Sequence, residues 1–186
     1  MNNVLFEEVK HDIAPDPQEW YIKQKDVPSF KGRVIRLKYL HKLNPDGKQL
    51  MGSVETALAY KEMQRCYIEG FYLSVIILAQ SLIEKILQDR LSMTRDVDKK
   101  DLRTVSSMLK VIRRKKLLHE FWISKIDRIR KIRNPITHLR KLGDPDFSDL
   151  GSSYAGKSVE KQIELDAKDA LEVSTHFSLS GLNKIF

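Results

Sequence analysis

Apolar residues recur every three or four positions from Ser53 onward, which is the spacing of one face of an α-helix. The first predicted helix begins at Ser53, whose hydroxyl suits an N-cap, and either has a joint at Gly70 or runs on into the next helix. A second covers residues 71–91, and a third follows Asp101 as its cap and ends in the basic run 113–116. The deep face of the second helix is expected to comprise Phe71, Val75, Leu78, Leu82, Ile86 and Leu87.

A fourth helix is predicted from about Glu120, and its apolar stripe stays in phase across Pro135. This stripe consists of Trp122, Ile126, Ile129, Ile132, Ile136 and Leu139. After a loop-like stretch over residues 143–157, a last helix starts at about Val159, with its acids expected on the outside. Its inward residues are expected to be Ile163, Ala167, Ala170, Leu171 and Ser174. Because the connections are short, the sequence predicts an all-α, up-and-down bundle of four to five helices over residues 53–186.

Residues 1–52 follow a different pattern and are expected to form an N-terminal extension. Apolar and basic residues alternate imperfectly over residues 31–41, and this period of two predicts a strand. The Asn-Pro-Asp-Gly sequence at residues 44–47 is a strong turn signal. A β-hairpin that returns through residues 49–51 is therefore a candidate element of the extension.

Composition narrows the class of protein. The 186 residues suffice for one domain with a hydrophobic core. A formal net charge of +8 favours a polyanionic partner, although solubility alone explains that charge equally well. Cys66 is the only cysteine, which excludes an internal disulfide and fits a reducing cytosol. The N-terminus lacks a secretory signal and the most apolar window, residues 71–79, is too short to span a bilayer, so we expect a cytoplasmic protein with no membrane partner.

The segment Arg133-Asn134-Pro135-Ile136-Thr137-His138 has the composition of a phosphate-cleaving site. A guanidinium stays charged and offers a planar fork of donors to phosphate oxygens. An imidazole titrates near neutrality, so it can take and return a proton. Residues five apart lie about 140° apart on an ideal helix, so Arg133 and His138 do not share a face, whereas Asn134 and His138 do. Pro135 predicts either a kink or a restart with Asn134 as N-cap, and both would move Arg133 toward His138.

The spacing of Arg and His alone is not specific, because it also occurs at Arg36–His41 and Arg114–His119. The third occurrence differs in its context, since Asn follows the Arg, Pro interrupts the backbone pattern, and a long helical stripe leads into it. Other catalytic signatures are missing from the sequence, including a Gly-rich phosphate loop, a Gly-x-Ser-x-Gly elbow and a His-Glu-x-x-His metal motif. We therefore expect neither a metal nor another cofactor.

With this motif on a helix, the chain resembles the HEPN superfamily, α-helical bundles of toxin–antitoxin, phage-defence and RNA-processing systems. Residues 133–138 match the family's Arg-x(4–6)-His pattern and its frequent Asn after the Arg. Residues 69–72 and 79–87 are similar to an earlier family helix, in which a Gly-aromatic start leads to an apolar stretch and an acid, here Glu84. The order of the helices also agrees, and the resemblance covers roughly residues 54–182.

The resemblance implies a metal-independent ribonuclease site that includes Arg133, Asn134 and His138. Asn134 would contact His138 or cap a helix. Glu84 would orient the Arg–His pair, with an exposed acid or a structural ion pair as the alternative role. The resemblance also implies a homodimer whose two motifs face each other, which would supply an acid and a base on opposite sides of one phosphate.

Positive charge is concentrated around the motif. Residues 110–141 hold twelve Lys or Arg and two acids, a balance of +10, while the rest of the chain is near −2. Candidate RNA-binding residues are Lys115, Lys116, Arg128, Arg130, Lys131, Arg140 and Lys141. A solvated helical face is the alternative for each. Phe121, Trp122 and Tyr154 are candidates for base stacking, although core packing is the commoner role of the first two.

The sequence therefore predicts a metal-independent endoribonuclease that cuts RNA through attack of the 2′-OH, as a toxin or phage-defence effector. Its expected partners are RNA, a second copy of the chain, and an antitoxin or regulatory protein. The alternative is a catalytically silent HEPN-like module that binds a protein or a nucleic acid.

Overall fold

The computed structural model describes residues 17–47, 53–137 and 158–180, and every regular element within these ranges is helical. The elements are α1 (Pro17–Leu43), α2 (Val54–Glu69), α3 (Tyr72–Ser92), the 3₁₀ turn η1 (Lys99–Leu102), α4 (Val105–Lys115), α5 (Glu120–Thr137) and α7 (Val159–Leu179). The predicted all-α bundle is confirmed.

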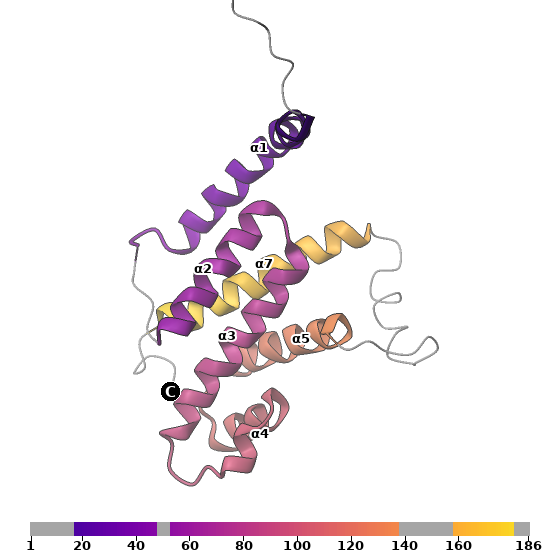
Figure 1. The fold of residues 1–186 in the computed structure, drawn as a ribbon. Coiled ribbons are helices and arrows are strands. Elements are labelled where there is room, and N and C mark those ends of the chain that lie inside the picture. The colour runs from indigo at the N-terminus through magenta and orange to yellow at the C-terminus, as the bar shows by residue number, and fades with distance from the viewer. Residues whose placement is uncertain (1–16, 48–52, 138–157, 181–186) are drawn as a thin grey trace, which may run out of the picture.

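α3 is the central helix, and it packs against α2, α4, α5 and α7 (Figure 1). Its sequence explains this position, because apolar side chains cover more than one of its faces. Val75, Leu87 and Leu91 are completely buried, and each such burial contributes roughly 1.5–3 kcal/mol. The prediction for Phe71 is wrong, since this residue lies directly before α3 and its side chain is 62% exposed.

Two of the predicted helix boundaries of the α2 region are confirmed by cap geometry. Ser53 Oγ accepts a hydrogen bond from the backbone N of Thr56 at 3.3 Å, so the first turn of α2 has a side-chain cap. Gly70 ends α2 with a φ of 85°, a left-handed conformation that Gly adopts without a Cβ penalty.

The predicted N-cap of the third helix is wrong. Asp101 belongs to η1, and α4 begins four residues later at Val105. The cap is Thr104, whose hydroxyl accepts from the Ser107 backbone N at 3.1 Å while Ser107 Oγ accepts from the Thr104 backbone N at 3.2 Å. This reciprocal arrangement satisfies two first-turn donors. The predicted end of the helix in the basic run is confirmed, since Lys116 ends α4 with a φ of 54°.

The strand predicted over residues 31–41 is also wrong, because these residues belong to α1. The side chains that hold α1 on the bundle follow a helical spacing. Arg36 Nε donates to the carbonyl oxygen of Ile68 at 2.7 Å, and Leu40, four residues later, is 6% exposed. The turn at 44–47 is confirmed by a hydrogen bond from Gly47 N to the Asn44 carbonyl oxygen at 3.2 Å, whereas residues 49–51 lie outside the described ranges.

Candidate functional site

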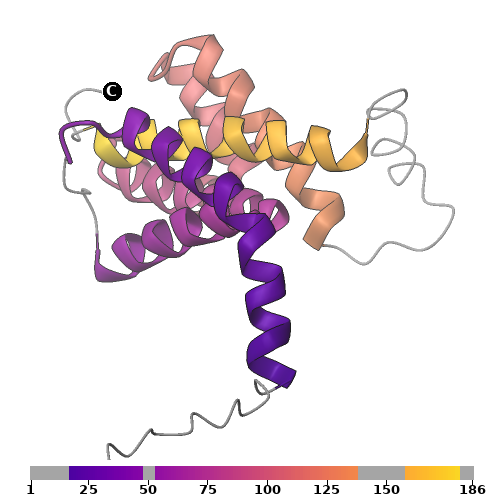
Figure 2. The same cartoon turned by 90° about the horizontal axis from the view of Figure 1, so that it is seen from above.

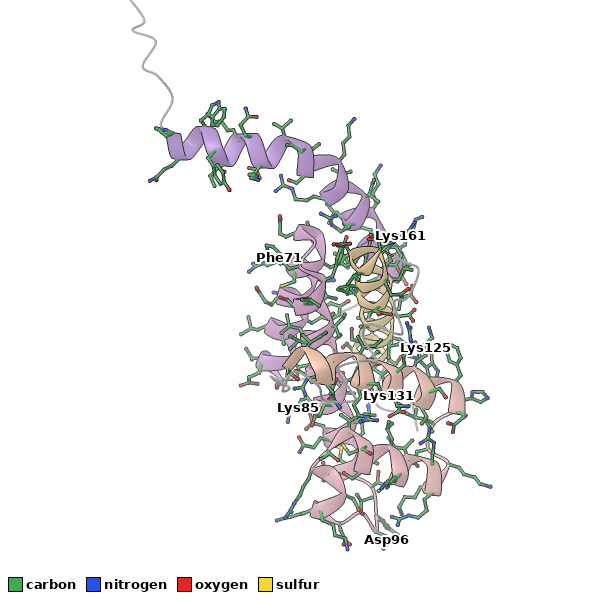
Figure 3. All side chains as sticks on the ribbon, turned by 90° about the vertical axis from the view of Figure 1, so that its right-hand side faces the viewer. Phe71, Lys85, Asp96, Lys125, Lys131 and Lys161 are labelled. Carbon is green, nitrogen blue, oxygen red and sulfur yellow. The ribbon has the colours of Figure 1, made fainter. Side chains whose placement is uncertain are left out.

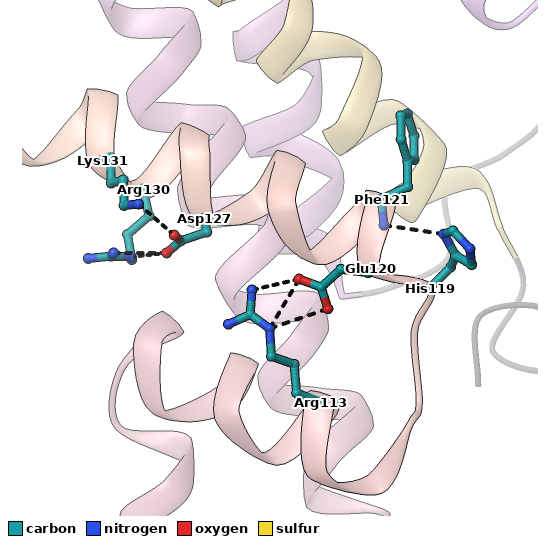
Figure 4. A network of polar contacts seen from close by, with 7 residues as sticks. All are labelled: Arg113, His119, Glu120, Phe121, Asp127, Arg130 and Lys131. Atoms are coloured by element: carbon teal, nitrogen blue, oxygen red, sulfur yellow. Dashed lines mark hydrogen bonds and ion pairs between the residues drawn. The ribbon is translucent and has the colours of Figure 1, made fainter.

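α5 carries the Arg133 motif at its C-terminal end, and a row of isoleucines sets its position. Ile123, Ile126 and Ile129 are at most 3% exposed, and α5 packs against α3, α4 and α7. The helix begins directly after His119, whose Nδ1 accepts a hydrogen bond from the backbone N of Phe121 at 3.2 Å (Figure 4). That amide lies in the first turn, where no helical carbonyl can reach it.

Two aspartates of α7 bind the basic residues in the middle of α5. Arg128 pairs with both Asp166 and Asp169, and Lys125 Nζ lies 3.1 Å from Asp169 Oδ1. The Asp166 side chain is only 2% exposed, although the acids of this helix were expected on the outside. Gln162 Nε2 donates to Asp166 Oδ1 at 3.2 Å. Because a buried carboxylate needs such donors, this cluster fixes α7 to α5.

Asp127, which belongs to α5 itself, binds two more of the predicted RNA-binding residues. Its Oδ1 lies 2.8 Å from Arg130 Nη2, and its Oδ2 lies 3.1 Å from Lys131 Nζ (Figure 4). Burial alone raises the pKa of Asp127, but the hydrogen bonds from Arg130 and Lys131 outweigh burial and lower that pKa. These two basic residues are therefore partly neutralised within their own helix.

The basic end of α4 makes similar contacts. Arg113 Nη2 lies 2.9 Å from Glu120 Oε1, and this pair, which joins α4 to α5, lowers the pKa of Glu120 (Figure 4). Lys115 Nζ donates to the carbonyl oxygen of Arg95 at 2.8 Å. Lys116 is exposed at the end of the helix. Of the two RNA-binding candidates on α4, only Lys116 presents its charge to solvent without a hydrogen bond to another described residue.

Arg133 differs from the other basic residues of α5. Its side chain is half-buried, and its Nε is enclosed without a hydrogen-bond acceptor among the described residues. No described carboxylate forms an ion pair with it. Leaving a buried donor unsatisfied costs about 1–3 kcal/mol. An anion that accepts a hydrogen bond from Arg133 would therefore gain more binding free energy than an anion that binds a fully hydrated guanidinium.

The backbone around Arg133 is helical on both sides of Pro135. α5 continues as an α-helix to Thr137, so of the two predicted alternatives, a kink or a restart, the restart does not occur, and Asn134 lies inside the helix instead of capping it. Thr137 Oγ1 donates to the carbonyl oxygen of Arg133 at 3.3 Å, a bond that Thr commonly makes to the preceding turn. His138, the other half of the predicted catalytic pair, lies outside the described residues, as do Arg140, Lys141 and Tyr154.

Gln80 is a buried polar residue of α3 that the sequence analysis missed. It is 5% exposed, and its Oε1 has no donor among the described residues. Around the axis of an ideal helix, Gln80 lies about 80° to one side of Arg90, which donates to a carbonyl oxygen of α7. It lies about 80° to the opposite side of Gln88, which donates to the carbonyl oxygen of Leu102 in η1. Gln80 therefore lies on the side of α3 between its contacts with α7 and with η1. Its signal in the sequence is an amide inside an otherwise apolar stretch.

Glu84 lies one turn after Gln80 and is half-buried. Neither a hydrogen bond nor an ion pair joins Glu84 to Arg133 within the described part of the chain. In Figure 3, Lys85, the next residue of α3, and Lys131 of α5 mark the region where the two helices cross. Arg133 of α5 and Gln80 of α3 thus provide one buried donor and one buried acceptor on two helices that pack together, while the role of Glu84 stays a prediction.

No family model, curated protein or solved structure matches this chain. What the site can do is therefore inferred from its own residues.

The other two Arg–His spacings have structural explanations. Arg36 ties α1 to α2 through the Ile68 carbonyl oxygen, and His119 satisfies an amide at the start of α5. Arg114 is exposed, with its nearest described carboxylate, Asp101, at 4.0 Å. Arg133, without a described partner, remains the candidate for ligand binding.

The aromatic residues near α5 divide into two groups. Trp122 stacks on His176 of α7, with ring centroids 4.1 Å apart and planes at 10°, so it belongs to the α5–α7 packing. Phe121 is 54% exposed and remains accessible to a ligand. Among the described residues, no group of three or more His, Cys, Asp or Glu could hold a metal ion. No helix in the same ranges has the length and apolar character needed to cross a bilayer.

Proposed function

We propose that this chain is a metal-independent endoribonuclease of the HEPN type, in which Arg133 and His138 act on the scissile phosphate. The observation that carries the proposal is a difference within α5. Lys125, Arg128, Arg130 and Lys131 all bind carboxylates, whereas Arg133 has no described carboxylate partner. An arginine that is half-buried and not neutralised is suited to bind a phosphate.

The chemistry needs no metal, because RNA carries its own nucleophile. The 2′-OH attacks the adjacent phosphorus, the bond to the 5′-oxygen breaks, and the products are a 2′,3′-cyclic phosphate and a 5′-OH. His138 would transfer a proton, which typically contributes about 10²–10⁴-fold in rate. Arg133 would stabilise the charge that develops on the phosphorane. A two-fold homodimer would supply the second His138, so that one imidazole acts as base and the other as acid.

Neighbouring residues would support this pair. Asn134 lies in the same helical turn as Arg133, and it would hydrogen-bond His138. Gln80 Oε1 is a buried acceptor on α3, the helix against which α5 packs, and with Glu84 it would orient the guanidinium. Lys116, Arg140 and Lys141 would contact the RNA backbone, while the ion-paired Arg128, Arg130 and Lys131 would contribute less. A toxin or phage-defence effector with an antitoxin or regulatory partner is the cellular role that fits such an activity.

The test is cleavage of single-stranded RNA and tRNA in the presence of EDTA. We expect Arg133→Ala and His138→Ala each to reduce cleavage by about 100-fold or more, with an unchanged circular dichroism spectrum. Lys131→Ala is the matched control, because Lys131 lies half a turn before Arg133 but is 69% exposed and ion-paired, and it should retain cleavage. Activity that survives both substitutions in the motif would rule out this site.

The second candidate function is a catalytically silent module that binds a protein. It is favoured by the ion pairs on α4 and α5, which neutralise Arg113, Arg128 and Arg130 and so weaken the case for a polyanion-binding surface. Absence of cleavage by the unmodified protein, together with stable capture of one protein partner, would support this function.

A further inference from the structure

α1 has apolar side chains on two opposite sides. One side packs on the bundle through Tyr39, Leu40 and Leu43. The other side carries Trp20, Val27, Phe30, Val34 and Leu37, which are called the α1 stripe below. The centres of the two sides lie about 160° apart on an ideal helix. Four residues of the stripe are 43–76% exposed, and Val34 is half-buried.

The α1 stripe is available for contact because the N-terminal half of α1 extends away from the other helices (Figures 2 and 3). α1 packs against α2 only through its C-terminal half, where Arg36 bonds Ile68 and Arg33 lies 3.5 Å from Glu69. Trp20, Val27 and Phe30 of the stripe each remain more than half exposed. Monomeric proteins rarely leave a contiguous apolar surface of this kind exposed, so the stripe is suited to bind a partner.

The spacing of the α1 stripe identifies the shape of that partner. Val27, Phe30, Val34 and Leu37 follow one another at intervals of three, four and three residues, and Trp20 precedes Val27 by seven. These intervals are those of positions a and d in a heptad repeat, the seam of a coiled coil. The stripe is about 25 Å long at 1.5 Å per residue. Pro28, which lies inside α1, falls outside the seam.

We propose that the α1 stripe pairs with the α1 stripe of a second copy of this chain, with the two helices antiparallel. The stripe is symmetric about a point between residues 28 and 29. An antiparallel partner therefore places Val27 opposite the partner's Phe30, and Trp20 opposite the partner's Leu37. Lys23, which occupies a d position, falls opposite the partner's Val34. A sequence with this symmetry is complementary to itself, as a two-fold interface requires.

Flanking charges favour the antiparallel direction. In an antiparallel pair the g positions of the two helices are neighbours, so Asp26 approaches the partner's Arg33 twice, once on each side of the axis. Asp26 already lies 3.1 Å from Arg33 within one chain, so in the dimer this pair would be shared between the two chains. A parallel pair would instead place Lys23 against the partner's Lys23 and Arg33 beside the partner's Lys38, with Asp26 beside the partner's Lys31 as its one attractive contact. Like charges in those positions would weaken a parallel pair.

Sedimentation equilibrium of the full chain tests the pairing. We expect a dimer, and we expect Val27→Asp and Phe30→Asp each to weaken it by at least about 100-fold, because a charge would enter the apolar seam. Ile22→Asp is the matched control, since Ile22 is 57% exposed on the same extended half but lies outside the stripe, and it should leave dimerisation unchanged. A monomeric protein, including one that binds phosphatidylserine vesicles through Trp20, would overturn the proposal. The pairing stands whether or not the chain cleaves RNA.

Cross-linking tests the direction of the helices. In a Cys66→Ser background, chains with Val27→Cys are mixed with chains of a different mass that carry Phe30→Cys, and both are oxidised. Disulfides require Cα atoms within about 7 Å. We expect the mixed disulfide between the two kinds of chain to predominate. Efficient cross-linking of Val27→Cys chains to each other would indicate parallel helices, and would overturn the antiparallel arrangement.

Discussion

The middle and the C-terminal end of α5 differ in how their positive charges are partnered. Over residues 125–131, two aspartates of α7 and one of α5 bind every lysine and arginine. Two residues later, Arg133 has a buried Nε and no described partner. The comparison teaches that positive charge along a helix does not by itself mark a binding surface. The middle of α5 uses its charges to hold helices together, and the end of α5 keeps a guanidinium that no described acid neutralises.

Replacing each of two arginines by lysine should sharpen this comparison most. Arg133→Lys keeps the charge but loses the planar fork of donors, so we expect RNA cleavage to fall about 10–100-fold. Arg128→Lys keeps its contact with a carboxylate of α7 and should change cleavage less than about threefold. Initial rates in EDTA measure both. Equal losses for the two variants would show that α5 has no functional division at Arg133.

Removing a partner of the buried acid should destabilise the bundle. Arg128→Ala leaves Asp166, with its side chain 2% exposed, without its main cation. We expect the free energy of unfolding to fall by about 2 kcal/mol, less than for a fully buried pair because Arg128 is half-exposed. Urea unfolding monitored by circular dichroism measures this. A change below about 0.5 kcal/mol would mean that the α5–α7 cluster contributes little to stability.

Removing the Arg133 guanidinium should instead raise the free energy of unfolding. Arg133→Met eliminates a buried donor that has no acceptor among the described residues and keeps an apolar stem, so we expect an increase of about 1 kcal/mol. Cleavage by this variant should be lost at the same time. Destabilisation in the same urea experiment would indicate that Arg133 has a structural role.

The ion pairs of Asp127 should make stability depend on pH at the acidic end. The folded-state pKa of Asp127 lies below its ordinary value of 3.8, so the unfolded chain binds protons first as pH falls. Its contribution is therefore fully present well above pH 3.8 and is lost as pH falls through the folded pKa. Asp127→Asn should cost less than about 1 kcal/mol at pH 6, and the cost should be smaller at pH 3. An equal cost at both values would exclude an electrostatic origin.

The smallest effect is expected at the surface of the same helix. Lys131 is 69% exposed, and exposed ion pairs contribute little. Lys131→Ala should change the free energy of unfolding by less than about 0.5 kcal/mol. A large loss of RNA binding in this variant, measured by filter binding, would show that ion-paired residues of α5 also contact RNA.

Much of the fold was predictable because its signals are local. The caps at Ser53 and Gly70 are determined by the residues themselves, and so is the isoleucine spacing of α5. The strand over residues 31–41 was predicted wrongly because an alternating pattern and a helical pattern overlap there. Only the docking of Arg36 and Leu40 on the bundle distinguishes the two patterns.

Only part of the candidate site could be predicted from the sequence. The sequence alone singled out Arg133 through its Asn-Pro context, and it predicted a basic surface around that residue. Which of those basic residues bind acids depends on Asp166 and Asp169, more than thirty residues further along the chain. Gln80 likewise became a candidate only through the tertiary structure, which encloses its Oε1 without a donor among the described residues.

By itself, the sequence determined the all-helical class, most helix boundaries of the bundle and the position of the Arg133 motif, because periodicity, caps and turns act over a few residues. Tertiary structure decided the conformation of α1 and the pairing of charges on α5. It also decided which polar atoms, such as Arg133 Nε and Gln80 Oε1, are enclosed without a partner among the described residues. These properties depend on contacts between segments far apart in the chain, where burial changes the strength of every charge and hydrogen bond.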